Sequence, residues 1–216
     1  MVLAALLILW IGAFTDLDLR LADASYDAPH RLFPWRDTWL ADRFSHVLLK
    51  RALTCLALLF IGAALWDWVW PRRWSGLLRL QLRVVALSAL LVPAAIALLK
   101  QLSVSHCPWD LQRYGGSAPY VRLLQAMPSG IDPGHCMPAG HASSALWMIS
   151  LAVFFLPARP RAAGVALALL LAAGFGMGWL QQLRGAHFLT HTLWSMWIAS
   201  AIVAIVTALL ARRTAL

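Results

Sequence analysis

The chain has 216 residues, of which 61% are hydrophobic and only 12% are charged, and its mean hydropathy is +0.71. This composition excludes an ordinary soluble domain and is typical of a protein that crosses a membrane several times. The formal charge of +9 does not indicate nucleic-acid binding, because arginines in so apolar a chain usually anchor cytoplasmic loops. We therefore expect a membrane protein with no nucleic-acid partner.

The apolar runs predict about six membrane-spanning helices. In chain order, the expected spans are residues 2–14, 52–70, 84–99, 142–156, 162–180 and 193–210. The first run lacks a basic leader region and a convincing cleavage site, which predicts a retained helix. Pro93 interrupts the third run and predicts a kink. No repeat or low-complexity linker divides the chain, so we expect one all-α membrane domain over residues 1–216.

The segment between the first two spans is amphipathic. Within residues 34–48, aromatic and aliphatic side chains recur among charged ones, which predicts a short helix lying at the membrane surface. The alternative is an ordinary packed connector, and the sequence does not choose between the two.

The distribution of charge predicts the orientation of the chain. The connections after the second and fourth spans and the C-terminal tail contain arginines and no acids, namely Arg72, Arg73, Arg79, Arg83, Arg159, Arg161, Arg212 and Arg213. The segment after the first span is instead rich in aspartate. The positive-inside rule therefore places both termini in the cytoplasm. Residues 15–48, 100–141 and 181–192 then face outward, towards the periplasm if the protein belongs to the inner membrane of a Gram-negative bacterium.

Three polar groups lie where apolar runs begin or end, on the predicted outer side. They are Lys100, one of only two lysines in the chain, His141 and His187. Polar groups in or beside lipid are costly unless they are satisfied, so they are candidates for function. Their common side predicts a single site.

The segments that carry these groups form three motifs. They are Lys100-Gln-Leu-Ser-Val-Ser-His-Cys107-Pro108, Pro138-Ala139-Gly140-His141 and Gly185-Ala-His187-Phe-Leu-Thr-His191. In this order and on one face, they resemble the motifs of the type 2 phosphatidic acid phosphatase (PAP2) superfamily of membrane phosphatases. The resemblance covers residues 84–210 and implies a PAP2-type helical core.

The resemblance also implies roles for these residues. His187 would be the nucleophile and His141 the general acid, while Lys100 and the backbone N–H groups of Ala139 and Gly140 would bind phosphate. Phosphoryl transfer depends mainly on positioning and on electrostatic stabilisation, which fixed cations and N–H donors can supply. No metal and no cofactor are therefore expected.

The motifs depart from the family pattern. Cys107 replaces one family arginine, Leu180 and Gln181 replace a Ser-Arg pair, Ala139 replaces a serine, and His191 stands where the family has aspartate. We expect His191 to hold the other ring nitrogen of His187, because a nucleophilic histidine needs a defined tautomer. Asp110 or Asp132 folding back is an alternative.

Two arginines are candidates to replace the missing ones. Arg113 and Arg184 lie near the first and third motifs, and guanidinium groups suit phosphate oxygens. For Arg113 the alternative is an ion pair with Asp110, and for Arg184 it is an interfacial anchor. A second register would make Arg184 and His191 the working pair, and an inactive descendant of the family is also possible.

Cys107 and Cys136 fall in the same outward segment. In an oxidising compartment such a pair favours a disulfide, which would join the first motif to the second. The alternative is a zinc site formed with His106 and His135.

These observations together predict a metal-free phosphatase that acts on a lipid phosphate or diphosphate at the outer face through a phosphohistidine. Candidate substrates are a polyprenyl diphosphate, a phosphatidyl phosphate and the phosphate of lipid A. Transfer of the phosphoryl group between lipids and non-catalytic binding of lipid phosphate are the alternatives. A transporter is disfavoured, because the ionisable residues gather at one face. The oligomeric state is left open.

Overall fold

The computed structural model describes residues 1–71 and 74–214, without the side chains of His46, Arg213 and Thr214. The described residues form helices and connecting loops, with no strand among them. Arg72 and Arg73, which supported the predicted orientation, lie outside the described residues.

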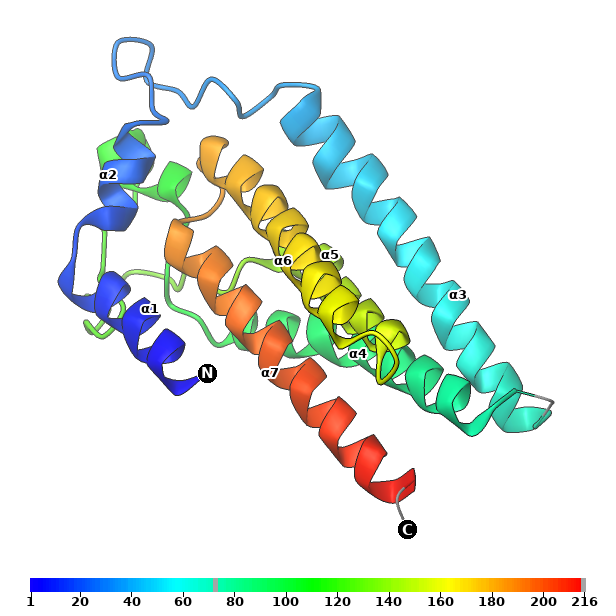
Figure 1. Cartoon of the computed structure of the whole chain (residues 1–216). Helices are drawn as coiled ribbons and strands as arrows, with labels where there is room; N and C mark the ends of the chain where they lie inside the picture. The colour runs from blue at the N-terminus through cyan, green and yellow to red at the C-terminus, as the bar shows by residue number, and fades with distance from the viewer. Residues whose placement is uncertain (72–73, 215–216) are drawn as a thin grey trace.

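Seven α-helices and four 3-10 or π-helical segments follow one another along the described chain (Figure 1). They are α1 (Val2–Phe14), α2 (Leu17–Asp23), η1 (Leu40–Leu49), α3 (Lys50–Val69), α4 (Gly76–Gln101), η2 (Pro108–Asp110), η3 (Gln112–Tyr114), α5 (Gly140–Leu146), η4 (Trp147–Phe155), α6 (Pro160–Leu183) and α7 (Leu189–Thr214).

The all-α membrane architecture is confirmed, whereas the count of six spans is not. Among the described residues, four helices are long and apolar enough to cross a membrane, namely Leu40–Val69, Gly76–Gln101, Pro160–Leu183 and Leu189–Arg212. α1 and α2 meet at an angle of 67° and together can form a fifth. The apolar helix Gly140–Phe155 is shorter than the others.

That shorter helix occupies the centre of the bundle. Ala142, Leu146 and Trp147 are almost fully buried and pack with Val85 and Val92 of α4. Gly174 of α6 permits the close approach, because a Cβ atom there would lie 2.4 Å from a methyl carbon of Leu146. The burial of α5 and η4 explains why they can be short: protein, rather than lipid, surrounds them.

The segment at residues 34–48 does not form a separate surface helix. Its helical part, η1, continues into α3 without a break, because Leu49 and Lys50 keep helical backbone angles. Ala41 and Ser45 are buried, and the Ser45 hydroxyl accepts a hydrogen bond from the Gln181 amide. The segment is therefore the first part of a longer helix: its Ala41 and Ser45 side packs on α6, whereas Trp39, Phe44 and Leu48 are exposed.

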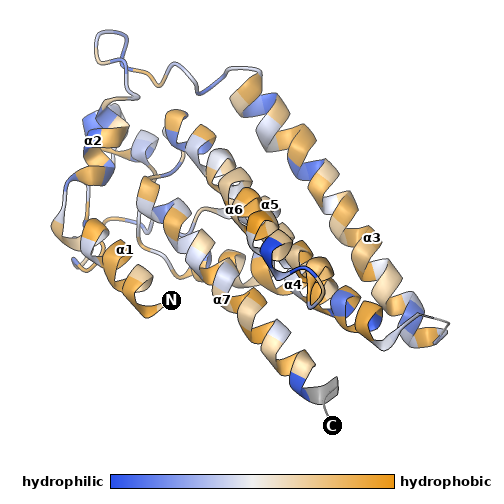
Figure 2. Ribbon diagram, viewed as in Figure 1, coloured by the Kyte–Doolittle hydropathy of each residue, from blue (hydrophilic) through white to orange (hydrophobic). Residues whose placement is uncertain are grey.

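The helix ends separate into two groups (Figure 1). α3, α5 and α7 begin at the end of the bundle where α4 and α6 finish. At the opposite end, hydrophilic residues lie near the first turns of α4 and α6 and the last turn of α7 (Figure 2). Asp67 of α3 pairs there with Arg79 of α4 at 3.1 Å. The arrangement brings all three motifs to one end and most described arginines of the predicted cytoplasmic segments to the other.

Candidate active site

Three histidines from two helix starts and one connection form the centre of the site. His187 lies between α6 and α7, His191 in the first turn of α7, and His141 in the first turn of α5. The ring centroids of His141 and His187 are 5.8 Å apart, and those of His187 and His191 are also 5.8 Å apart. His187 and His191 are buried. The structure thus brings together the three histidines that the motifs singled out.

Backbone hydrogen bonds hold the start of α5 against the start of α7. The Ala139 N–H donates to the carbonyl of His191 at 3.0 Å, and the Ser195 hydroxyl lies 3.0 Å from the carbonyl oxygen of Ala139. The N–H of Ala139 is therefore already used, and its predicted contact with phosphate is not supported. Gly140 remains a candidate, because its N–H lies in the first turn of α5.

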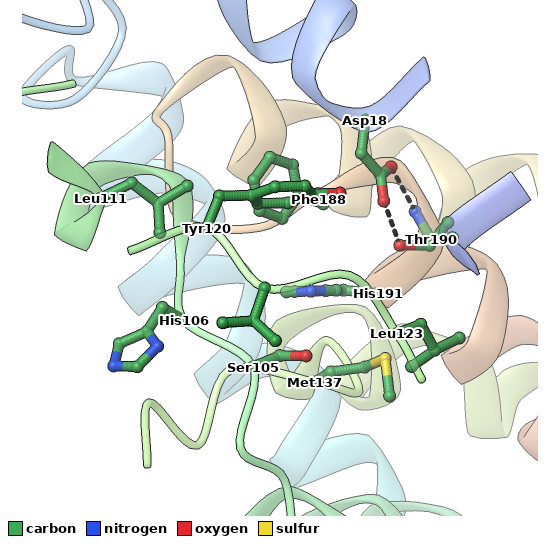
Figure 3. Close-up of a pocket in the computed structure, with 12 residues that line it drawn as sticks. Asp18, Ser105, His106, Leu111, Tyr120, Leu123, Met137, Phe188, Thr190 and His191 are labelled. Carbon is green, nitrogen blue, oxygen red and sulfur yellow. Dashed lines mark hydrogen bonds between the residues drawn. The ribbon is translucent and has the colours of Figure 1, made fainter. Parts of the chain in front are cut away.

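A buried carboxylate from α2 caps α7. Asp18 accepts hydrogen bonds from the backbone N–H of Thr190, at 3.0 Å, and from its hydroxyl (Figure 3). An acid at a helix start is favourable because it meets free N–H groups and the positive end of the helix dipole. The cap fixes the turn that carries His191. The motifs gave no sign of this role, since Asp18 lies 172 residues before Thr190.

Asp18 and His191 also border a small pocket that includes His106 and Tyr120 (Figure 3). Its volume is about 20 Å³, enough for about one water molecule. Burial raises the pKa of the Tyr120 phenol to about 12, with the charge of Asp18 adding to the effect, so that this side chain stays neutral.

The predicted disulfide between Cys107 and Cys136 is confirmed, with Cα atoms 5.3 Å apart. Sγ of Cys136 lies 3.4 Å from Nδ1 of His187. A disulfide sulfur has no hydrogen to donate, so the contact is compatible with a proton on Nδ1 and a lone pair on Nε2, and the backbone of Cys136 is a second hydrogen-bond partner of the His187 ring. The alternative zinc site lacks its sulfur ligands, because zinc binds the thiolate form.

The sulfur and the backbone of Cys136 contact the His187 ring, where we expected His191 or an aspartate. Among the described residues, no hydrogen bond joins His187 to His191, Asp110 or Asp132, and Nδ1 of His191 has no partner. His191 is a close neighbour of His187 rather than its hydrogen-bond acceptor.

His187 is held in its neutral form. Burial lowers its pKa well below the ordinary value of 6.5, and His191, His141 and Lys100 lower it further. A neutral imidazole with its lone pair on Nε2 is the form that can attack an electrophile.

Lys100 and His141 line one cavity of about 470 Å³ between α3, α4 and α5. Lys100 passes beside Gly140, where a Cβ atom would lie 4.0 Å from its Cδ. Lys50, at the start of α3, lines the same cavity. The motifs gave Lys50 no role, although its rarity in the chain, where Lys100 is the only other lysine, is a usable signal.

The two candidate arginines have other partners. Arg184 donates to Asp42 at 2.9 Å and to the backbone carbonyl of Arg36 at 2.9 Å, which joins the end of α6 to the connector before α3. Arg113 forms a two-pronged ion pair with Asp23, both contacts at 2.7 Å. Neither arginine lines the cavity, so their predicted phosphate contacts are not supported, and the alternative pairing of Arg113 with Asp110 is not seen either.

The comparisons with known proteins agree with the motifs. The chain matches the family model described as PAP2 superfamily over residues 81–215, which is more than half of its length. No curated protein and no solved structure matches it. The matched region contains Lys100, the disulfide and all three histidines of the site. This chain belongs to the PAP2 superfamily.

Proposed function

We propose that this protein is a phosphatase of membrane lipid phosphates, which works without a metal through a phosphohistidine at the outer face of the membrane. Membership of the PAP2 superfamily suggests phosphatase or phosphotransferase activity. The observation that carries the finer proposal is the placement of neutral, buried His187, whose ring centroid lies 5.8 Å from those of both His191 and His141, while His141 lines a cavity together with Lys100.

The reaction would proceed in two steps. Nε2 of His187 attacks phosphorus, and the bond from phosphorus to the lipid oxygen breaks. His141 donates a proton to the departing oxygen, while Lys100 and the N–H of Gly140 stabilise the charge on the phosphoryl oxygens. Water then attacks the phosphorus of the phosphohistidine and gives a proton back to His141, while the bond from phosphorus to Nε2 breaks, which releases inorganic phosphate and regenerates neutral His187.

The small pocket beside His191 favours hydrolysis over transfer. It lies against the histidine cluster, whereas Lys100 and His141 line the cavity between α3, α4 and α5. Its volume of about 20 Å³ suits a water molecule and excludes a second lipid. Transfer to another lipid would use the same intermediate but would need the acceptor to enter through the larger cavity.

The test is phosphate release by the purified protein in detergent, with EDTA present. The substrates are dipalmitoyl phosphatidate, undecaprenyl diphosphate and lipid A. We expect His187→Ala to abolish release and His191→Ala to weaken it, because only His187 forms the covalent bond. His30→Ala is the matched control, since His30 is exposed and pairs with Asp27.

Three outcomes separate the candidate functions. Release that survives EDTA and disappears in His187→Ala supports the proposal, and acid-labile label on the wild-type protein but not on His187→Ala identifies the intermediate. Labelled phosphate appearing on an added acceptor lipid, without free phosphate, replaces hydrolysis by transfer. Binding of lipid without release or label, unchanged in His187→Ala, replaces the enzyme by a binding module.

A further inference from the structure

Both lysines of the chain lie at the same cavity, although they are 50 residues apart in the sequence. Lys100 ends α4 and Lys50 begins α3, so the two side chains enter from different helices. Lysine is placed nowhere else in this protein. This convergence is the starting point of the inference.

The cavity carries positive charge with no compensation. No aspartate is among its lining residues, and the chain has no glutamate. Within the described part of the chain, Lys50 forms no ion pair and no side-chain hydrogen bond, in contrast to Arg113 and Arg184. A cleft with one sign of charge and apolar walls attracts ions of the other sign. Two ammonium groups match the two negative charges of a phosphate monoester.

The remainder of the cavity is apolar and follows the two helices. On α3, Lys50, Thr54, Leu58 and Ile61 share one face at helical spacing, and Leu90 lies on the facing helix α4. The stretch from Lys50 to Ile61 is about 16 Å long at the rise of an α-helix, which is close to half the thickness of the hydrocarbon layer. Leu58 is 60% exposed and Leu90 is 50% exposed, so the cleft is open at its side.

We propose that Lys50 is a second phosphate-binding residue, which holds the headgroup together with Lys100 while a hydrocarbon chain of the same lipid lies in the cleft between α3 and α4. The inference rests on the proposed function and deepens it. Lys50 then supplies the site with a second cation, which neither Arg113 nor Arg184 can provide because neither lines the cavity. It also makes the substrate a lipid with its chain inserted beside the phosphate, rather than a soluble phosphate ester.

The first experiment removes the charge of Lys50. In Lys50→Gln we expect kcat/KM for dipalmitoyl phosphatidate to fall about ten- to a hundredfold, the range for loss of one charged hydrogen bond. The inhibition constant of inorganic phosphate should rise with it. Lys50→Arg should restore most of both. Arg51→Gln is the matched control, because Arg51 is the exposed neighbour outside the cavity.

The second experiment blocks the cleft without touching charge. Ala97 is exposed and lines the cavity, whereas Ala94, on the same helix and also exposed, does not. Ala97→Phe should lower kcat/KM for phosphatidate and leave the inhibition constant of inorganic phosphate unchanged, since that ion needs no chain site. Ala94→Phe should change neither value.

The outcomes distinguish this inference from the proposed function. If the wild type turns over phosphatidate and kcat/KM is the same in Lys50→Gln as in Arg51→Gln, the role of Lys50 is overturned and the proposed phosphatase activity stands. If Ala97→Phe affects free phosphate as strongly as lipid, the cleft does not hold the chain. If the wild type releases no phosphate, equilibrium binding of labelled phosphatidate decides: equal binding by wild type and Lys50→Gln overturns the inference, and weaker binding by the variant supports it.

Discussion

The contact between Cys136 and His187 is unusual in kind. A carboxylate normally orients a nucleophilic or basic histidine, whereas here a disulfide sulfur lies 3.4 Å from Nδ1. Sulfur is a weak acceptor, so it adds little to the basicity of the ring. Its contribution, together with the hydrogen bond from the ring to the backbone of Cys136, is to favour one tautomer. The absence of a negative charge beside His187 also helps to keep the imidazole neutral.

The neutral state of His187 has a pH signature. Because its pKa in the folded protein is well below 6.5, the imidazole remains able to attack at pH values where a free histidine is protonated. We expect the acidic limb of kcat/KM, after correction for the titration of the substrate phosphate, to lie well below pH 6.5. The stability of the fold also falls towards acid pH. Unfolding exposes an imidazole that binds a proton below pH 6.5, so the contribution of His187 to the free energy of unfolding decreases as the pH falls below that value. NMR of the histidine rings in micelles provides the direct check. A ring signal that titrates at pH 6.5 or above and that disappears in His187→Ala would refute the lowered pKa of His187.

Reduction of the disulfide tests the orienting role of sulfur. A Cys136 thiol carries its own proton and can donate it to Nδ1, which leaves the tautomer undefined. We expect kcat to fall severalfold in Cys136→Ser and in the reduced protein, because a weak acceptor is lost while the backbone partner of the ring at Cys136 remains. KM should change little, because the phosphate-binding groups remain.

Cys107→Ser serves as the comparison, since it also opens the disulfide, and Cys55→Ser as the control, since Cys55 is not bonded. Opening a loop of 29 residues costs roughly 3 to 4 kcal/mol of stability, so the rates must be compared on folded protein. Full kcat in the reduced, folded enzyme would remove sulfur from the mechanism.

At the scale of elements, the site depends on how helix starts are fixed. α7 carries His191 in its first turn and is held there by Asp18 of α2 and by the backbone bond from Ala139 of α5. The end of α6 is held by Arg184, which reaches the connector before α3. The histidines of the site are therefore placed by polar contacts between elements far apart in the chain.

The cap of α7 should be measurable as stability. Asp18→Ala leaves the N–H and hydroxyl of Thr190 without their acceptor, which should cost about 1 to 2 kcal/mol. The midpoint of thermal unfolding in detergent is the measurement. Asp37→Ala, at an exposed position, is the control and should shift the midpoint much less. Equal shifts would show that the cap contributes nothing.

The two arginines should differ in stability and agree in phosphate binding. Arg184→Met breaks a nearly buried set of hydrogen bonds and should destabilise by about 2 kcal/mol, whereas Arg113→Met loses an exposed pair worth less than about 1 kcal/mol. The inhibition constant of inorganic phosphate should be unchanged in both. A severalfold rise in either variant would restore that arginine to the phosphate site.

At the scale of the whole molecule, the described arginines of the predicted cytoplasmic segments, at the starts of α4 and α6 and the end of α7, lie at the end of the bundle opposite the histidine cluster (Figures 1 and 2). With the positive-inside rule, this separation predicts that a tag fused after the last helix is cytoplasmic. In intact cells, an impermeant protease should spare such a tag and should cleave a site inserted near Gly130, in the outer connection. The reverse pattern would invert the orientation and move the site to the cytoplasmic face.

The sequence predicted local features better than contacts between distant segments. The first span, at residues 2–14, matches α1 at both ends, because a continuous apolar run needs no tertiary information. The expected span at residues 142–156 is a shorter apolar helix, which is not confirmed as a span, and hydropathy alone cannot tell burial in protein from burial in lipid. The disulfide was one of two interpretations of paired cysteines in an outward segment, and it is confirmed.

The misses have one physical cause. Arg113 and Arg184 were matched to phosphate by their distance along the chain, yet their partners Asp23 and Asp42 come from before α3. Asp18 likewise caps α7, and Lys50 lines the same cavity as Lys100. In both cases the sequence does not relate the two segments. Motif spacing reports neighbours within a helix or turn, and only the packing of helices brings the remaining groups together.

The match to the family begins at residue 81, so α3 lies outside it. Under the proposal, one of the two phosphate-binding lysines and one wall of the cleft would then be encoded outside the stretch that carries the histidines. Mutations in α3 that keep Lys50 would retune which lipid is accepted without altering any histidine of the core. Exchange of this one helix between related proteins that share this lysine is expected to shift the preferred chain, a route by which a single catalytic core can diversify.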